Sequence, residues 1–288
     1  MCFGTTGTAQ AYGPDDVSSS AVGLARIVVG GALLGVLAWW VAGRPRAAIA
    51  SRSARDLGTV LLGGAAVLAY QPTFFAGARL NGVAIGAVVT LGAAPALTGL
   101  LEWATTRVVP SRTWLVATVC AVAGVTLISG LTEGAGGDVS LRGLAASLGA
   151  AASYAGYTVA AKRLLDDSWT PTAAIGSMFA AAAVIGLPFL LLVDLGPLAS
   201  PSGIAMVGWL AVVTIVVAYV LFAIGLQRLT ASTVSTLTLV EPLTACVLGL
   251  VLLDERVSPT GWTGLAVLLA GVVLLATPRR SAPLVVEA

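Results

Sequence analysis

The chain has 288 residues, of which 58% are hydrophobic and only 10% are charged, and its formal net charge is +2. A soluble domain carries about 25% charged residues, so this composition excludes an ordinary soluble fold. The small net charge forms no basic stripe and gives no indication of a nucleic-acid partner. With three cysteines and no histidine, the chain has no disulfide framework and lacks the commonest metal ligand and general base. We therefore expect an all-α polytopic membrane protein without a cofactor or metal.

Apolar runs separated by short turns predict the membrane-spanning helices. A span needs about 20 apolar residues, so a chain of this length holds about ten. Nine long runs lie at residues 20–42, 57–77, 80–103, 113–131, 141–163, 171–193, 203–226, 230–253 and 260–277. A tenth run, from Met1 to about Tyr12, is too short to span and lacks the basic start of a signal peptide. We interpret it as the end of a truncated first helix.

Lys and Arg residues predict the orientation, because positively charged loops stay cytoplasmic. If the loop after 20–42 lies inside, eleven of the fifteen Lys and Arg residues fall in inside loops. Arg79, Arg142 and Arg256 then fall outside, and Arg26 lies within a helix. The outside loops are acidic instead. This split predicts a cytoplasmic C-terminus.

The two halves of the chain contain matching residues at a constant offset. Pro95 matches Pro242, 147 residues later, and Ala123-Gly124-Val125-x-Leu127 matches Ala270-Gly271-Val272-x-Leu274 at the same offset. Five helices, an odd number, in each half require the second half to lie upside down relative to the first. Such inverted repeats are typical of alternating-access transporters, whose substrate site lies near the membrane midplane.

These residues resemble the EamA-type, ten-helix members of the drug/metabolite transporter superfamily. The closest stretch is Val240-Glu241-Pro242, followed by Asp254-Glu255-Arg256 and Gly271-Val272-Val273-Leu274-Leu275. Phe3-Gly4-Thr5-Thr6 is similar to the end of the family's first helix, and Arg26 lies where the family often has arginine. The resemblance covers nearly the whole chain through short motifs.

The resemblance implies a bundle of two inverted five-helix repeats, at residues 1–131 and 141–277, with a cytoplasmic tail at 278–288. It also implies an inner (plasma) membrane exporter of amino acids, related metabolites or drug-like compounds. The chain departs from the family pattern in its incomplete first helix. It also departs at the first-half turn, which reads Thr106-Arg107 where the second half has Glu255-Arg256.

Glu241 is the leading candidate for a functional residue. It lies near the middle of the predicted span 230–253, where a charge costs at least ~2.5–3.5 kcal/mol. An acid kept at that depth can bind and release a proton or contact a cationic substrate. The alternative is a neutral Glu241 that hydrogen-bonds a neighbouring helix and only shapes the bundle.

Other polar residues within the spans are candidates to line a cavity. Arg26 can either contact an anion or extend to the membrane surface. Tyr154 and Tyr157, three residues apart, share a helical face and can stack on a substrate. The full set comprises Thr5, Thr6, Gln10, Tyr70, Gln71, Thr90, Tyr154, Tyr157, Tyr219, Thr236 and Thr238. For each of them the alternative is a hydrogen bond between helices.

Three prolines within spans, Pro72, Pro95 and Pro242, are candidate hinges, because proline removes a backbone donor and permits a kink. We predict a secondary active transporter of small metabolites, with the bilayer and a small-molecule substrate as partners and protons as a candidate coupling ion. It would act as a monomer or homodimer. A Walker motif is missing, which argues against direct use of ATP. The alternatives are a non-transporting or degenerate scaffold, a channel and, less favoured, a membrane-embedded enzyme.

Overall fold

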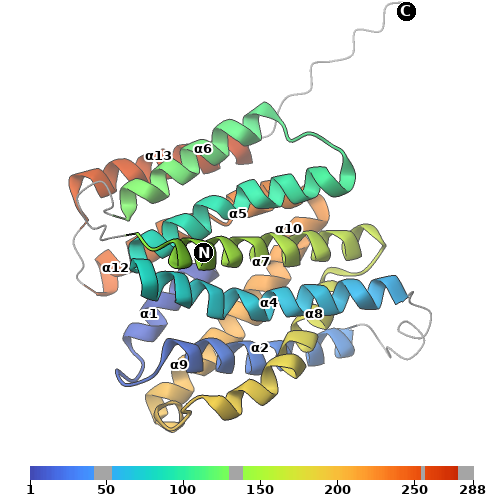
Figure 1. Ribbon diagram of the computed structural model, residues 1–288, viewed down its shortest axis with the longest axis vertical. Coiled ribbons are helices and arrows are strands. Elements are labelled where there is room, and N and C mark those ends of the chain that lie inside the picture. Colours follow the sequence, from blue (N-terminus) through green and yellow to red (C-terminus); the bar gives the residue numbers. More distant parts are fainter. Residues whose placement is uncertain (42–53, 130–138, 254–256, 278–288) are drawn as a thin grey trace, which may run out of the picture.

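A computed structural model describes residues 1–41, 54–129, 139–253 and 257–277 of the protein (Figure 1). Every regular element in these ranges is a helix. Seven of the described helical segments are long and apolar enough to cross a membrane. The predicted tail 278–288 and the Asp254-Glu255-Arg256 motif lie outside the described residues.

The helices follow the predicted runs closely. The first half contains η1 (Cys2–Gly4), α1 (Thr5–Ala11), α2 (Ser19–Val41), α4 (Ala54–Asn81), α5 (Val83–Thr106) and α6 (Arg112–Ile128). The second half contains α7 (Leu141–Asp166), α8 (Pro171–Gly186) with η3 (Leu187–Leu192), η4 (Pro197–Ala199), α9 (Pro201–Ala211), the π-helical turn η5 (Val212–Val217), α10 (Ala218–Arg228), α11 (Ala231–Leu237), α12 (Val240–Leu252) and α13 (Pro259–Ala276). The chain is therefore a polytopic all-α membrane protein, as its composition predicts.

Local sequence explains where many of these helices begin. A Ser or Thr before the first turn accepts a hydrogen bond from a backbone N–H three residues on, which satisfies a donor that the helix itself cannot. The capping residues are Ser111, Ser140, Thr170, Ser200, Thr230 and Ser258. Pro171, Pro201 and Pro259 follow three of these caps, in a position where the missing N–H of proline costs nothing.

Helices from the two halves pack against each other throughout the bundle. α2 packs on α8, α6 on α13, and both α4 and α5 on α7 (Figure 1). Gly124 shows how close α6 and α13 lie, because a Cβ atom there would meet the backbone nitrogen of Leu268 at 2.6 Å. Small residues at such contacts allow helix backbones to approach within a membrane, where no hydrophobic force drives the helices together.

The predicted span 230–253 is not one continuous helix. It is divided into α11 and α12 by a turn at Thr238 and Leu239. The cause is Pro242, whose ring would clash with the carbonyl group four residues earlier, at Thr238, in an unbroken helix. The preceding span 203–226 is also irregular, because η5 separates α9 from α10, and π-helical turns occur frequently at functional sites.

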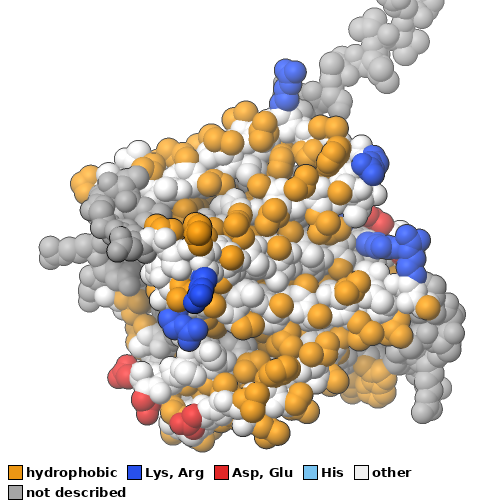
Figure 2. Space-filling model, in the orientation of Figure 1, with side chains coloured by type: hydrophobic (Ala, Val, Ile, Leu, Met, Phe, Trp, Pro, Cys, Tyr) orange, Lys and Arg blue, Asp and Glu red, His pale blue; other side chains and the backbone are white. Residues whose placement is uncertain are grey.

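The outer surface of the bundle is apolar. Trp40, Leu62 and Leu191 are 76%, 75% and 87% exposed. Exposing such apolar side chains is unfavourable in water and favourable in lipid. Hydrophobic side chains cover the face shown in Figure 2, and charged side chains lie toward its edges. We call the end at which α5, α7 and α10 terminate the basic end, since it carries Arg107, Lys162, Arg163 and Arg228. Asp15, Asp16 and Asp194 belong to loops at the opposite end.

Candidate functional site

Glu241 lies in the first turn of α12, directly after the break. Its backbone N–H donates to the carbonyl oxygen of Thr238 at 2.9 Å, and its side chain is half-buried. Gly4 packs against this turn so closely that a Cβ atom there would lie 2.8 Å from the Glu241 carbonyl oxygen and 2.7 Å from Cβ of Thr244. The segment from η1 to α1 therefore forms one wall beside Glu241.

Arg26, from α2, supplies the positive charge near Glu241. The two groups interact electrostatically, but within the described ranges no Lys or Arg nitrogen lies within the 4.0 Å of an ion pair with Glu241. Gln71, from α4, is assigned with its side-chain oxygen toward Arg26, so that it accepts from Nη2 at 2.5 Å and from Nε at 3.3 Å. Gln71 thus orients the guanidinium group, and no carboxylate of the described residues forms an ion pair with it.

Tyrosines from three helices surround these charges. Tyr70 (α4), Tyr154 (α7) and Tyr219 (α10) lie in the neighbourhood of Glu241. The hydroxyl groups of Tyr157 and Tyr219 lie 3.2 Å apart, and the rings of Tyr154 and Tyr157 meet edge to face at 5.1 Å. Such edge-to-face pairs are favoured by the ring quadrupoles. The predicted face of Tyr154 and Tyr157 is therefore part of an aromatic cluster.

Phenylalanines close this aromatic cluster around Tyr219. The ring of Tyr219 lies 5.0 Å from Phe3, 4.3 Å from Phe179 and 5.8 Å from Phe222, measured between centroids. Tyr219 is positioned by the end of η5, where the extra residue of the π-helical turn shifts the following side chains. Arg26, Tyr70, Tyr154, Tyr219 and Glu241 are each partly exposed rather than fully buried.

The predicted threonines divide into two groups. Thr238, in the break, bonds the Tyr154 hydroxyl group at 2.8 Å and so belongs to the site. Thr90 and Thr236 are fully buried and hydrogen-bond neighbouring helices, at the Ser147 carbonyl oxygen and the Thr118 hydroxyl group. For these two the structure favours the packing alternative over a cavity.

Thr5 and Thr6 lie on α1, and Thr5 lines a cavity of about 470 Å³ described below. Thr5 accepts from Trp209 Nε1 at 3.0 Å, and Thr6 donates to the carbonyl oxygen of Phe3 in the preceding helix η1 at 2.6 Å. Among the predicted hinges, Pro242 lies just after the break, whereas α4 and α5 continue through Pro72 and Pro95. Hinge motion at the prolines stays a prediction.

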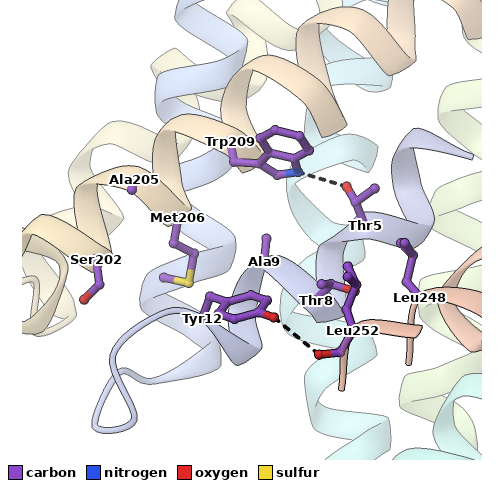
Figure 3. A pocket seen from close by; sticks show the side chains of 10 residues that line it. All are labelled: Thr5, Thr8, Ala9, Tyr12, Ser202, Ala205, Met206, Trp209, Leu248 and Leu252. Atoms are coloured by element: carbon purple, nitrogen blue, oxygen red, sulfur yellow. Dashed lines mark hydrogen bonds between the residues drawn. The ribbon is translucent and has the colours of Figure 1, made fainter. Parts of the chain in front are cut away.

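Several cavities lie toward the end opposite the basic end. One of about 640 Å³ runs between α1, α6, α12 and α13, and its lining includes Gly4, Pro242, Cys246 and Ser258. Another, of about 470 Å³, lies between α1, α9 and α12 (Figure 3). In Figure 3 the Trp209 indole points to Thr5, and the Tyr12 hydroxyl group points to the Leu252 carbonyl oxygen. The first cavity reaches the turn that carries Glu241.

Sequence reasoning missed Glu102, near the end of α5. Its carboxylate accepts from the backbone N–H groups of Ala231 at 2.7 Å and of Ser232 at 3.1 Å, at the start of α11. The available signal was an acidic residue at the end of the predicted span 80–103, close to Arg107 and Arg112.

Comparisons with known proteins agree with this architecture. The model of the EamA-like transporter family matches residues 1–130 and again residues 141–277. An uncharacterised transporter, YwfM of Bacillus subtilis (strain 168), is 34% identical over 279 residues, which cover 96% of this chain and 91% of that protein. The threonine/homoserine exporter RhtA of Escherichia coli (strain K12) is 32% identical over 140 residues, or 46% of this chain and 44% of RhtA.

The fold also matches a solved structure. A protein crystal structure aligns with a TM-score of 0.79 at 17% identity and covers 95% of this chain and 92% of its own. This likeness concerns the fold alone. The family model matches both halves of the chain, and YwfM matches it over nearly its whole length. The chain therefore belongs to the EamA-like transporter family.

Proposed function

We propose that this transporter exports a small amino-acid-like zwitterion across the plasma membrane by alternating access. The observation that carries the proposal is the pair of opposite charges, Arg26 and Glu241, which act on each other across the centre of the bundle without forming a direct ion pair. Charges held apart in a low-dielectric interior are costly unless a ligand completes them. A zwitterion carries both complementary charges close together.

Each end of such a substrate has a matching group. The Arg26 guanidinium group, oriented by Gln71, offers a planar fork suited to a carboxylate. Glu241 offers its carboxylate to an ammonium group, and the aromatic cluster of Tyr154, Tyr157 and Tyr219 would add cation–π attraction. The name of RhtA, a threonine/homoserine exporter, supports the same substrate class and direction of transport.

Inverted repeats provide the means of alternating access in this proposal. The family model matches both halves. If the spans of the two halves are paired in chain order, α2 corresponds to α8 and α6 to α13, and each of these corresponding pairs is in contact. The contact between α4 and α7 likewise corresponds to the one between α9 and α1. These correspondences support two related halves that rock about a central site.

The basic end faces the cytoplasm in this proposal, because positively charged loops are retained inside. Arg107, Arg112, Lys162, Arg163 and Arg228 would then lie inside, as would the C-terminus.

Glu241 also serves as the group that couples transport to protons, since an acid at this depth can be neutral or charged according to what occupies the site.

Counterflow in proteoliposomes tests the proposal. Purified protein is reconstituted with unlabelled amino acids inside, and uptake of labelled threonine, homoserine and other amino acids is followed. We expect saturable exchange of at least one zwitterion, competed much more strongly by its unlabelled form than by the corresponding amine or acid alone. Exchange of only uncharged or singly charged compounds would refute a zwitterion site.

The variant Glu241→Gln tests the central residue, and Asp16→Asn is its matched control, since Asp16 is an exposed loop carboxylate. Losing a charged hydrogen bond costs about 1.5–3 kcal/mol, which corresponds to roughly a tenfold to hundredfold loss of affinity. We expect that loss for Glu241→Gln, together with loss of any response to a pH gradient. Wild-type affinity in Glu241→Gln would remove Glu241 from the proposed site.

A further inference from the structure

The geometry points to Glu102 as the latch of a gate that closes the basic end of the transporter. This inference rests on the proposed alternating-access function and adds to it the residue that seals one side. Glu102 belongs to the first half of the chain and its partners, Ala231 and Ser232, to the second. The contact therefore joins the two parts that must separate when the site opens to that side.

The latch is made of two charge-assisted hydrogen bonds. One carboxylate oxygen of Glu102 accepts from Ala231 N–H at 2.7 Å and the other from Ser232 N–H at 3.1 Å. Bonds to a charged acceptor are about twice as strong as bonds between neutral groups. Trp114, in α6, donates its indole N–H to the carbonyl oxygen of Ser232 at 3.0 Å. The first half thus binds both the backbone N–H and the carbonyl oxygen of Ser232.

Beneath the latch the two halves stay in polar contact over the next turn of α11. Thr98 donates to the Ser235 hydroxyl group at 3.3 Å, and the hydroxyl oxygens of Thr118 and Thr236 lie 2.9 Å apart. Thr98 and Thr236 are fully buried, and Ser235 is 1% exposed. Solvent at the basic end therefore does not reach the central charges through this seam.

Toward the opposite end, the described residues enclose a cavity instead of such a seam. The cavity of about 640 Å³ extends from Ser258, at the start of α13, to Pro242 and Gly4 beside Glu241. Near the basic end, a groove of about 430 Å³ has a lining that runs only from Ala96 to Trp114, so this groove does not lie between the halves. Among the described residues, the site is therefore sealed toward the basic end, and the cavity of about 640 Å³ leads from the turn of Glu241 toward the other end.

α11 connects the latch to the site. It is a single helix of seven residues, from Ala231, bound by Glu102, to Leu237, directly before the break at Thr238. A change at the break, where Tyr154 and Glu241 meet the substrate, is transmitted along this short helix to Ser232. Both partners of the latch become hydrated when it opens at the membrane surface, so breaking it costs far less than breaking a buried contact.

Cysteine labelling tests the latch without knowledge of the substrate. In a protein with Cys2, Cys120 and Cys246 replaced by serine, Ser235→Cys places a thiol in the seam, and a membrane-impermeant maleimide is applied to inside-out vesicles. Adding Glu102→Ala should speed labelling about tenfold, because the loss of charge-assisted bonds shifts the equilibrium toward the opened gate. Thr105→Ala, an exposed neighbour on the same helix end, should leave the rate unchanged. Equal labelling rates in all three proteins would overturn the latch.

A reversible cross-link gives a second test with a protein that keeps Glu102. The Thr98 and Ser235 oxygens lie 3.3 Å apart, close enough for Thr98→Cys and Ser235→Cys to form a disulfide under mild oxidation. Oxidation should reduce amino-acid counterflow at least about tenfold, and dithiothreitol should restore it, because a closed gate blocks alternating access. Undiminished counterflow in the fully cross-linked protein would show that the seam does not open during transport.

The two tests separate the latch from the proposed function. If the reduced protein exchanges no zwitterion, the substrate proposal fails, while the labelling rates still decide whether Glu102 closes the basic end. If the reduced protein exchanges normally and labelling is indifferent to Glu102→Ala, the transporter stands and the latch is refuted.

Discussion

The hydroxyl group of Tyr154 in α7 lies 2.8 Å from Oγ1 of Thr238, in the two-residue break between α11 and α12. Thr238 donates its own proton to the carbonyl oxygen of Ser235 at 2.7 Å, so Tyr154 is the donor between the two hydroxyl groups. A side chain of the aromatic cluster thereby fixes the turn that presents Glu241. In the proposed function, this contact would link substrate binding to the geometry of the interrupted helix.

Removing that hydroxyl group should weaken substrate binding more than it weakens the fold. In Tyr154→Phe we expect the unfolding free energy to fall by only ~0.6 kcal/mol, the average for a hydrogen bond between membrane helices. The half-saturation concentration in counterflow should rise several-fold, since the break loses its anchor. Tyr12→Phe serves as control, because its exposed hydroxyl group bonds Leu252 far from the site. Unchanged half-saturation in Tyr154→Phe would show that the break holds its shape without Tyr154.

Arg26→Gln should change which substrates the protein prefers. The variant keeps a hydrogen-bonding side chain but loses the charge that we assign to the substrate carboxylate. We expect affinity for zwitterions to fall about tenfold to hundredfold, by the cost of losing a charged hydrogen bond. Affinity for the matching amine, which lacks the carboxylate, should be unaffected or improved. Competition assays with the zwitterion and the amine give the ratio of the two affinities in each protein.

Arg55→Gln is the control for Arg26→Gln, because Arg55 is exposed at the start of α4. An equal loss of affinity for both ligands in Arg26→Gln would mean that the arginine supports the fold of the site rather than selects the carboxylate.

Gly124→Ala should destabilise the contact between α6 and α13. The added methyl group would lie 2.6 Å from the backbone nitrogen of Leu268 and 2.7 Å from the carbonyl oxygen of Gly264. Backbone atoms on a packed helix cannot give way cheaply, so we expect a loss of about 1–3 kcal/mol. Gly225→Ala, in α10, meets nothing within 4 Å and should be neutral or slightly stabilising. Thermal unfolding in detergent compares the two variants, and equal midpoints would contradict the close packing.

The pair Thr118 and Thr236 should respond unequally to valine. Thr236 donates to the carbonyl oxygen of Ser232 at 3.1 Å, so the hydrogen bond of 2.9 Å between the two threonines takes its proton from Thr118. Thr236→Val therefore leaves the buried Thr118 hydroxyl group without its acceptor. Thr118→Val leaves Thr236 with its hydrogen bond to the carbonyl oxygen of Ser232. A stranded buried donor costs about 1–3 kcal/mol, more than the ~0.6 kcal/mol average of a lost bond. A double-mutant cycle measures both costs, and a larger loss for Thr118→Val would reverse the assigned direction.

The sequence by itself determined the membrane-spanning architecture. The predicted runs 57–77 and 80–103 correspond to α4 and α5, and run 260–277 coincides with α13 to within a residue at each end. The reason is physical: the bilayer demands a fixed length of apolar chain, and each helix satisfies its own backbone, so both signals are local. Glu241 was identified by the same argument, since the cost of an acid within a span depends only on its depth.

Only the tertiary structure decided which polar side chains share a site and which merely pack. Thr90 and Thr238 carry the same side chain within apolar runs, yet Thr90 is fully buried against Ser147 and Thr238 meets Tyr154 beside Glu241. Glu102 hydrogen-bonds Ala231, a residue 129 positions away, and this contact is visible only in the folded chain. Hydropathy reports the depth of a residue in the membrane, but the direction a side chain faces and the partner it meets are set by the packing of helices that are distant in the sequence.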